Sequence, residues 1–202
     1  MEERPIIRPK KLSLYKALKL GYLRNERKQK KRLKRFGYVI DTSLSNRERM
    51  VAYNPRTNKV IYVSNGSDTN PLHFRQFAKD WGQTNLGGTL TGEIKNTLRY
   101  KQEEEAYNKT REKYQNAKVV LVGHSLAGGI VSRIAKPSDT AITLDPALIN
   151  QKPRPNVDNY RVRGDIVSTF SKDTTTLPNP SNYPNPIQAH NIENIKNQPI
   201  FI

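Results

Sequence analysis

The chain has 202 residues, of which 35% are hydrophobic and 26% charged, and it contains no Cys. This length favours one domain with a modest core, and the lack of Cys excludes a disulfide framework, a thiolate metal site and a cysteine nucleophile. The formal net charge of +17 favours contacts with anionic partners.

Residues 1–36 are predicted to form a basic N-terminal extension, separate from a domain over residues 37–202. The segment carries 14 Lys and Arg against three Glu, and residues 27–35 are a nearly pure basic run. Such a segment typically contacts phosphates, so we expect it to bind an anionic membrane surface or nucleic acid. A disordered tail that only raises solubility is the alternative. An apolar stripe at helical spacing lies in its middle, formed by Leu14, Tyr15, Leu18, Tyr22 and Leu23.

The start of the chain, MEERPIIRPKK, lacks the apolar region of a secretion signal. No run of apolar residues is long enough to cross a bilayer. We therefore expect no transmembrane segment, and an intracellular or virion-associated protein.

Three short strands are predicted next, over residues 36–40, 49–53 and 60–63. Residues 54–58 read Asn-Pro-Arg-Thr-Asn, which favours a tight turn and therefore a hairpin of the second and third strands. The third strand runs into residues 64–68, Ser-Asn-Gly-Ser-Asp. A loop just after an early strand can supply a backbone N–H to an oxyanion hole.

Two helices are predicted before the next strand. Residues 70–81 begin with Asn-Pro, a typical helix start, and continue with apolar residues at helical spacing. Residues 82–92 are rich in Gly and predict an exposed loop. Residues 93–116 are highly charged and predict a surface helix that covers a sheet.

Residues 117–130, AKVVLVGHSLAGGI, have the pattern of a strand, a tight turn and a helix. The run of Val and Leu has no helical period, which is typical of a strand buried on both faces, and apolar residues return at helical spacing from Ile130 onward. A nucleophile elbow requires this context, with an exposed serine, here Ser125, and small residues two positions to either side. Gly123 and Ala127 occupy these positions, although Gly is usual at both. The alternative is a Gly-rich turn that binds a phosphate at the N-terminus of the helix.

Two more buried strands are predicted at residues 140–144 and 160–162, and Asp145 and Asp165 follow them. Strands that alternate with helices predict an α/β fold, with a mostly parallel sheet and helices on both faces. In such a fold an active site lies beyond the carboxyl ends of the strands. Both aspartates and Ser125 are expected at that edge.

A serine nucleophile requires a base, and the base requires a carboxylate that holds its tautomer. Of the three His, His124 is adjacent to Ser125 and cannot easily fold back onto its hydroxyl, and His73 lies far upstream. His190 follows the last strand, where hydrolases with the order serine, acid, histidine carry the base. A solvated loop residue is the alternative. The acid is either of the two aspartates that follow strands.

These segments, in this order, resemble the class 3 lipase family of α/β-hydrolases, which comprises fungal-type triacylglycerol lipases and their relatives. The similarity covers residues 48–195. It includes the hairpin VAYNPRTNKVIYVSNGS, the pair Asp80-Trp81 followed by Thr84-Asn85-Leu86, the elbow KVVLVGHSLAGG and the stretch YRVRGDIVS, with Pro178 and His190 after them.

The resemblance implies a catalytic triad of Ser125, Asp165 and His190, and an oxyanion hole formed by the backbone N–H groups of Ser67 and Leu126. It also implies a serine ester hydrolase that acts on lipid or phospholipid esters through an acyl-enzyme. No cofactor and no metal are expected for this chemistry.

The chain departs from the family's pattern in several places. Arg-Gly-Thr is usual where this chain has Asn65-Gly66-Ser67, and the long lid helix of many lipases is missing. The segment TLDPALI is more similar to pancreatic-type lipases, in which that aspartate is the triad acid. Asp145 therefore remains an alternative to Asp165.

Small hydrolases of this kind also occur among viruses with double-stranded DNA, so a viral member of the family is a further expectation. A virion structural or nucleic-acid-packaging protein on a degenerate hydrolase scaffold is the alternative function. In that case residues 1–36 would be the functional part.

Overall fold

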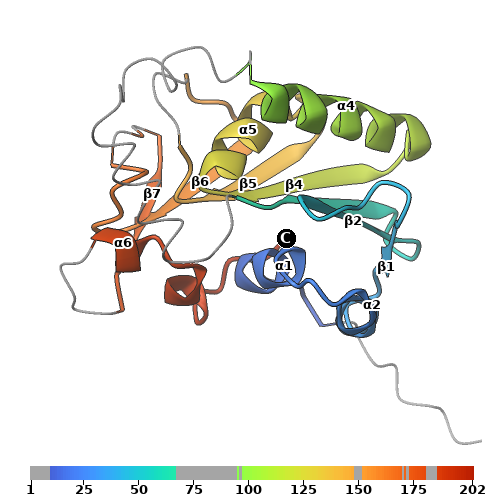
Figure 1. The fold of residues 1–202 in the computed structure, drawn as a ribbon, viewed down its shortest axis with the longest axis horizontal. Coiled ribbons are helices and arrows are strands. Elements are labelled where there is room, and N and C mark those ends of the chain that lie inside the picture. Colours follow the sequence, from blue (N-terminus) through green and yellow to red (C-terminus); the bar gives the residue numbers. More distant parts are fainter. Residues whose placement is uncertain are drawn as a thin grey trace, which may run out of the picture.

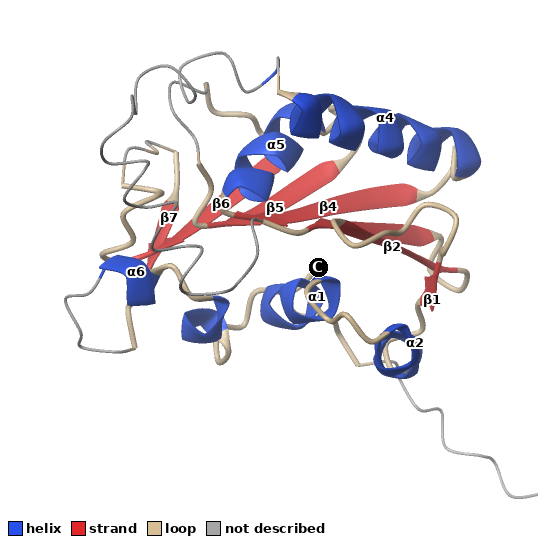
Figure 2. Cartoon of the chain, in the orientation of Figure 1, coloured by secondary structure: helices blue, strands red, loops and turns tan. Residues whose placement is uncertain are grey.

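The computed structural model describes residues 10–66, 95, 97–147, 152–169, 171, 173–180 and 186–202. Within these residues the chain forms a seven-stranded sheet with helices on both faces (Figures 1 and 2). Two helices cover one face, α4 (Leu98–Lys113) and α5 (Leu126–Ile134), and two lie on the other, α1 (Leu14–Gly21) and α2 (Glu26–Lys34).

The strands lie side by side in the order of the sequence. The first two pairings are antiparallel, and the four that follow are parallel. The predicted α/β-hydrolase-like fold with a mostly parallel sheet is thus confirmed. The strands are β1 (Val39–Ile40), β2 (Arg49–Asn54), β3 (Lys59–Ser64), β4 (Lys118–His124), β5 (Thr140–Leu144), β6 (Val157–Val162) and β7 (Thr175–Leu177).

The predicted hairpin is formed by β2 and β3, with Asn54 paired to Lys59 at its closed end. The Asn54 side chain accepts hydrogen bonds from the backbone N–H groups of Arg56 and Thr57, which closes the turn. Asn58 has a φ of 47°, a left-handed conformation that Asn tolerates better than most residues. The turn chemistry in the sequence therefore accounts for the pairing of these two strands.

The β4 strand is buried on both faces, as its unbroken Val and Leu run predicts. Val119 and Leu121 pack with Ile130 of α5 in one core cluster. Val120 and Val122 belong to the other cluster, together with α1. Because side chains alternate along a strand, this single strand contributes to both cores.

The α1 helix is part of the core, which corrects the prediction of a separate extension over residues 1–36. Leu14, Ala17 and Leu18 recur at helical spacing and are buried, in a cluster with residues of β2, β3 and β4. Burial of one leucine side chain stabilises a fold by about 1.5–3 kcal/mol, and α1 buries several of them. The basic residues of α1 lie on its exposed side and do not oppose this packing. A domain boundary at residue 36 therefore does not fit the structure.

The two ends of the described chain also hold each other. The Leu14 N–H donates to the carbonyl of Ile200 at 2.9 Å, and the Ile202 N–H donates to the carbonyl of Leu12 at 3.0 Å. The Tyr15 hydroxyl donates to Glu193 at 2.7 Å, in the short helix η2 (Ile192–Ile195). The C-terminus accordingly lies beside α1 in Figure 1.

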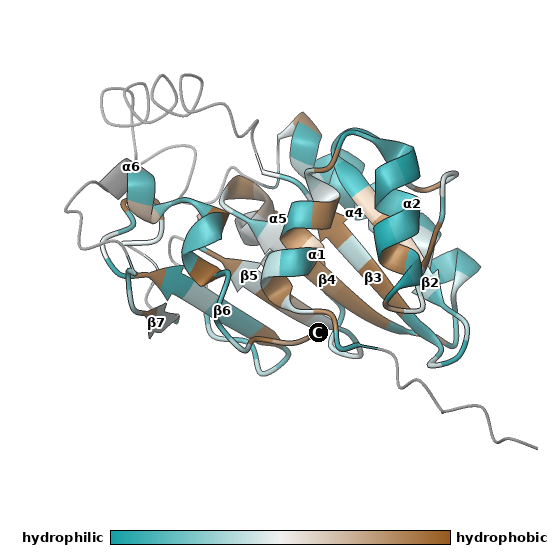
Figure 3. Cartoon of the chain, turned by 90° about the horizontal axis from the view of Figure 1, so that it is seen from below, coloured by the Kyte–Doolittle hydropathy of each residue, from teal (hydrophilic) through white to brown (hydrophobic). Residues whose placement is uncertain are grey.

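The α2 helix is different, because it is attached to the fold by few residues. Leu33 is buried, and the buried Gln29 side chain donates to the carbonyl of Leu20 at 2.9 Å. Figure 3 shows the rest of α2 as mostly hydrophilic, in contrast to the hydrophobic β3 and β4. Its exposed basic residues are Arg27, Lys28, Lys30, Lys31, Arg32 and Lys34.

The remaining predictions have mixed outcomes. The helix over 70–81 and the Gly-rich loop over 82–92 lie outside the described residues, as do His73 and Ser67. The charged segment 93–116 contains α4, and the strand expected at 160–162 begins earlier, as β6. Neither β7 nor the short helix α6 (Pro186–Ala189) was expected. Among the described residues, none of the helices has the length and apolar content needed to span a bilayer.

Candidate active site

Ser125 lies at a sharp turn between β4 and α5. Its φ of 59° and ψ of −129° are strained for a residue with a side chain, as a nucleophile elbow requires. A Cβ atom added at Gly123 would lie 2.6 Å from the carbonyl oxygen of Ala127, so only Gly permits strand and helix to approach this closely. Ala127 itself is buried, and its methyl group is accommodated. The local geometry is therefore that of the predicted elbow.

His190 and Asp165 come together at the same edge of the sheet. His190 Nδ1 lies 2.6 Å from Asp165 Oδ1, and both side chains are buried. The other carboxylate oxygen of Asp165 accepts hydrogen bonds from the backbone N–H and the hydroxyl of Ser168, at 2.6 and 2.5 Å. Burial alone would raise the pKa of Asp165, but the hydrogen bonds from His190 and Ser168 hold it below its ordinary value. Asp165 is therefore suited to hold a histidine in one tautomer and to stabilise its cation.

Asp145, the alternative acid, has a different environment. Its Oδ1 accepts from the Val162 N–H at 2.7 Å, and the residue is fully buried with a φ of 45°. Burial, and then the neighbouring charge of Asp165, raise the pKa of Asp145 well above its ordinary value. With its pKa raised, Asp145 is a poorer partner for an imidazolium than Asp165, whose pKa is lowered. The contacts of the two aspartates thus favour Asp165.

His124 has hydrogen bonds that explain why it does not serve as the base. Its Nε2 lies 3.1 Å from the carbonyl oxygen of His190, which can only accept, so Nε2 carries the proton. Burial and the adjacent His190 lower the pKa of His124 to about 3, so the ring is neutral and Nδ1 is an acceptor. The two histidine rings lie 4.6 Å apart between centroids. His124 therefore supports the loop that carries His190.

Tyr22 completes this hydrogen-bond chain from the end of α1. Its hydroxyl lies 3.1 Å from His124 Nδ1, to which it donates, and it accepts the Gly66 N–H at 2.9 Å. Gly66 directly precedes Ser67 in the chain. In the sequence Tyr22 belongs only to an apolar stripe, because a contact between residues 102 positions apart leaves no local signal.

The chain that leads to Ser67 passes against the elbow. A Cβ atom added at Gly66 would lie 2.9 Å from the carbonyl oxygen of His124 and 3.4 Å from the Cβ of Ser125. Leu126 is the first residue of α5, where backbone N–H groups have no acceptor within the helix. The predicted oxyanion donor Leu126 thus adjoins Ser125, whereas the other, Ser67, lies outside the described residues.

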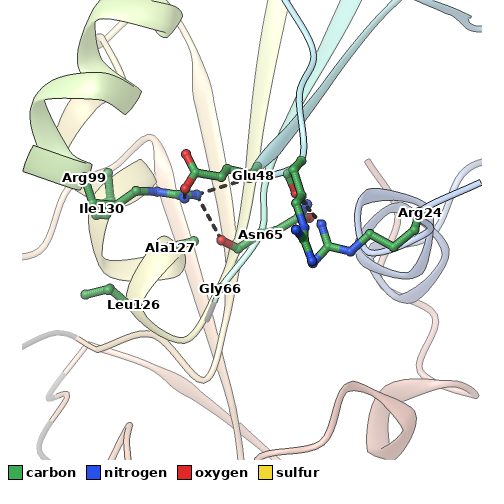
Figure 4. Close-up of a pocket in the computed structure, with 9 residues that line it drawn as sticks. Arg24, Glu48, Asn65, Gly66, Arg99, Leu126, Ala127 and Ile130 are labelled. Atoms are coloured by element: carbon green, nitrogen blue, oxygen red, sulfur yellow. Dashed lines mark hydrogen bonds and ion pairs between the residues drawn. The ribbon is translucent and has the colours of Figure 1, made fainter. Parts of the chain in front are cut away.

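A cavity of about 290 Å³ opens beside Gly66 and Leu126 (Figure 4). One wall is apolar and consists of Leu126, Ala127 and Ile130 from α5. The rest of the described lining includes three arginines and one glutamate, namely Arg24, Arg47, Arg99 and Glu48, and Figure 4 shows Arg99 beside Ile130 and Arg24 on the other side.

One cluster of possible metal ligands occurs among the described residues, formed by His124, Asp145 and His190. Their nearest ligand atoms all lie within 4.8 Å of one another. Both ring nitrogens of His124 are engaged, one with Tyr22 and one with the carbonyl of His190. The burial that raises the pKa of Asp145 also disfavours the ionised carboxylate that a cation would bind. The donor set therefore fits the hydrogen-bond network better than it fits a metal.

Comparison with known proteins finds no matching family model and no matching curated protein. Solved structures of fungal lipases do match. The nonglycosylated Lip2 lipase of Yarrowia lipolytica has 12% identity and a TM-score of 0.45, with 82% of this chain and 77% of that chain covered. Another structure of Lip2 has 13% identity and a TM-score of 0.42, with coverage of 65% and 60%. The Rhizomucor miehei lipase propeptide complex has 16% identity and a TM-score of 0.39, with coverage of 67% and 52%.

In the latter two comparisons the match thus spans little more than half of the known lipase. The resemblance to fungal-type lipases that the motifs predicted is found again among solved structures.

Proposed function

We propose that this protein is a serine ester hydrolase that acts on lipid or phospholipid esters. The observation that carries the proposal is the buried contact between His190 Nδ1 and Asp165 Oδ1, at the sheet edge where Ser125 occupies a strained elbow. These are three side chains in the roles that acyl transfer needs: a nucleophile, a base and an orienting carboxylate.

In the proposed mechanism the Ser125 hydroxyl attacks the ester carbonyl, and His190 Nε2 takes its proton. The tetrahedral oxyanion is stabilised by the backbone N–H of Leu126 and by that of Ser67. Collapse expels the alcohol, which receives the proton from His190 and leaves an acyl-enzyme on Ser125. A water molecule then attacks the acyl group, again with His190 as base, and the carboxylic acid leaves. Asp165 stabilises the imidazolium in both halves.

The basic surface is proposed to bring the enzyme to its substrate. Six exposed Lys and Arg lie on α2, and each contributes on the order of 1 kcal/mol near an anionic membrane. The same surface suits nucleic acid, so a virion structural or packaging protein on an inactive hydrolase scaffold is the second candidate. The net charge of +17 is the observation that favours it.

An active-site-directed fluorophosphonate separates the two candidates. The enzyme proposal expects covalent labelling of the wild type, loss of labelling in Ser125→Ala, and retention in Ser138→Ala, a control at an exposed turn. Loss of a triad member should also lower the turnover of p-nitrophenyl hexanoate by about three decades or more. A folded wild type that resists the probe and does not hydrolyse the ester would support the packaging candidate.

A further inference from the structure

The Arg99 side chain reaches from the first turn of α4 to the end of β3, beside the candidate site (Figure 4). Its Nη2 lies 3.1 Å from the carbonyl oxygens of both Asn65 and Glu48, and 3.3 Å from the Ser64 hydroxyl. Its Nη1 pairs with the Glu48 carboxylate at 2.8 Å. One guanidinium thus connects three separate segments of the chain: α4, the end of β3 and the residue before β2.

This guanidinium is itself held by a buried carboxylate. Arg99 Nη2 lies 3.1 Å from Oε1 of Glu103, which is one turn further along α4 and fully buried. The Tyr62 hydroxyl donates to the other oxygen of that carboxylate at 2.6 Å, and Arg49 pairs with Oε1 at 3.6 Å. A buried carboxylate is costly unless it is paired, so the pair with Glu103 holds the guanidinium in one place. Arg99 is therefore a fixed donor and not a solvated surface charge.

The contact with Asn65 holds one end of a peptide group whose other end is held by Tyr22. The carbonyl of Asn65 and the N–H of Gly66 belong to the same planar unit. Its oxygen accepts from Arg99, and its N–H donates to the Tyr22 hydroxyl at 2.9 Å. Because both polar ends are engaged, this unit cannot turn without the loss of a hydrogen bond. The next residue in the chain is Ser67, the proposed second donor of the oxyanion hole.

We propose that Arg99 is a positioning residue for the oxyanion hole, because it holds the peptide group that precedes Ser67. Donors stabilise a transition state best when they are already aimed at the oxyanion before the reaction begins. A loosened strand would bind the substrate as before and stabilise the tetrahedral intermediate less well. The inference rests on the proposed function, because it concerns the oxyanion of the same reaction at Ser125.

The test variant is Arg99→Lys, because lysine keeps the positive charge but lacks the planar fork that reaches several acceptors at once. The control is Arg111→Lys, about 18 Å further along the same helix at 1.5 Å per residue. Arg111 pairs with the buried Asp139 at 3.3 Å and donates to the carbonyl oxygen of Ala117 at 2.8 Å. Its side chain is 18% exposed, against 23% for Arg99, so the two sites are matched in burial and in the kind of contact.

A second variant, Arg99→Gln, removes the charge as well. Glu103 keeps Tyr62 and Arg49 as partners in both Arg99 variants, so both are expected to fold.

For p-nitrophenyl hexanoate we expect kcat and kcat/KM to fall equally, by about tenfold, in each Arg99 variant, as when a contact of the transition state alone is lost. Hexylboronic acid forms a tetrahedral anionic adduct with a serine hydroxyl, so its inhibition constant should rise about tenfold as well. Arg111→Lys should keep the wild-type values of all three. A purely structural role for Arg99 would lower the thermal midpoint and leave these constants unchanged, and that result would overturn the proposal.

A measurement without turnover separates this inference from the proposed function. Hydrogen exchange of the Asn65 and Gly66 amides is followed by NMR in the wild type and in the three variants. Faster exchange of these amides in the Arg99 variants but not in Arg111→Lys supports the positioning role even if the wild type hydrolyses no ester. Exchange rates equal to those of Arg111→Lys would refute it even if the wild type is an active esterase.

Discussion

The α1 and α2 helices are neighbours in a single basic stretch of sequence, yet they relate to the fold in opposite ways. The α1 helix buries Leu14 and Leu18 between the sheet and the C-terminal segment, and Tyr22 follows it into the candidate site. The α2 helix buries Leu33 and Gln29 and exposes its basic residues. The net charge of this stretch therefore describes only the solvent side of its helices. The apolar spacing of each helix decides whether it belongs to the core.

The largest expected effect is on stability, from truncation of the α1 core. Leu18→Ala should lower the free energy of unfolding by about 2–5 kcal/mol, because Leu18 is fully buried and its loss leaves a cavity. The control is Leu98→Ala, whose side chain is 71% exposed and whose effect should be within about 0.5 kcal/mol. Urea denaturation measures both. Equal midpoints for the two variants would restore α1 to the status of a detachable appendage.

The second effect concerns binding through α2. Replacement of Lys28, Lys31, Arg32 and Lys34 by Gln should weaken binding to anionic vesicles by about 1 kcal/mol for each residue that lies near the surface. The free energy of unfolding should change little, because all four side chains are exposed.

The matched control has the same charge change in exposed lysines elsewhere, Lys101, Lys118, Lys136 and Lys152. Vesicle sedimentation and duplex DNA titration are run side by side. A loss of affinity for DNA alone would favour the packaging candidate. Equal losses of affinity in the test and control variants would mean that α2 is not a specific binding surface.

The contrast between the two helices also shows what could be predicted from sequence. The β4 strand and the elbow could be predicted because their signals are local: an apolar run, a serine and small neighbours within 14 residues. The burial of α1 could not, although its stripe was visible, because its partners lie on β3 and β4 and in the last residues of the chain. The β7 strand has only three residues, two of them exposed Thr, so nothing in its sequence distinguishes it from a loop.

For the candidate site the same reasoning applies. Ser125 and His190 followed from motif order, whereas the sequence left two aspartates open until the structure showed which of them contacts His190. Tyr22 and the arginines of the cavity are brought together by tertiary packing alone.

The third effect is on turnover, through the contact of Tyr22 with the site. Tyr22→Phe removes the acceptor of the Gly66 N–H and the donor to His124. We expect kcat to fall about 10- to 100-fold, equivalent to about 1.4–2.8 kcal/mol, with a smaller change in KM. The reason is that His124 supports the loop that carries the base His190, and Gly66 precedes the proposed oxyanion donor Ser67. Tyr15→Phe, on the same helix but bonded to Glu193, is the control. If Tyr22→Phe lowers stability and kcat by no more than Tyr15→Phe does, Tyr22 has a purely structural role.

The smallest expected effect is on the pH dependence of stability. It compares a long-range ion pair of α1 with a local ion pair of α2. Glu193 lies 2.6 Å from Lys19 of α1 and accepts from Tyr15, and these two hydrogen bonds lower the pKa of Glu193 below its usual 4.5. A carboxylate whose pKa is lower in the folded chain contributes stability that is fully present above the unfolded value and is lost as the pH falls through the folded value. Glu193→Gln should therefore destabilise the protein at pH 7 and approach the wild type below about pH 4. The pair is nearly half exposed, so the difference in the free energy of unfolding at pH 7 should be less than about 1 kcal/mol.

The comparison variant is Glu26→Gln, which breaks the exposed ion pair of Glu26 with Lys30. That pair lies within α2 and does not connect separate segments of the chain. Thermal unfolding at pH 7 and pH 3 should show the larger pH-dependent difference for Glu193→Gln. The reverse order would mean that the contact between α1 and η2 adds nothing beyond the apolar packing beneath it.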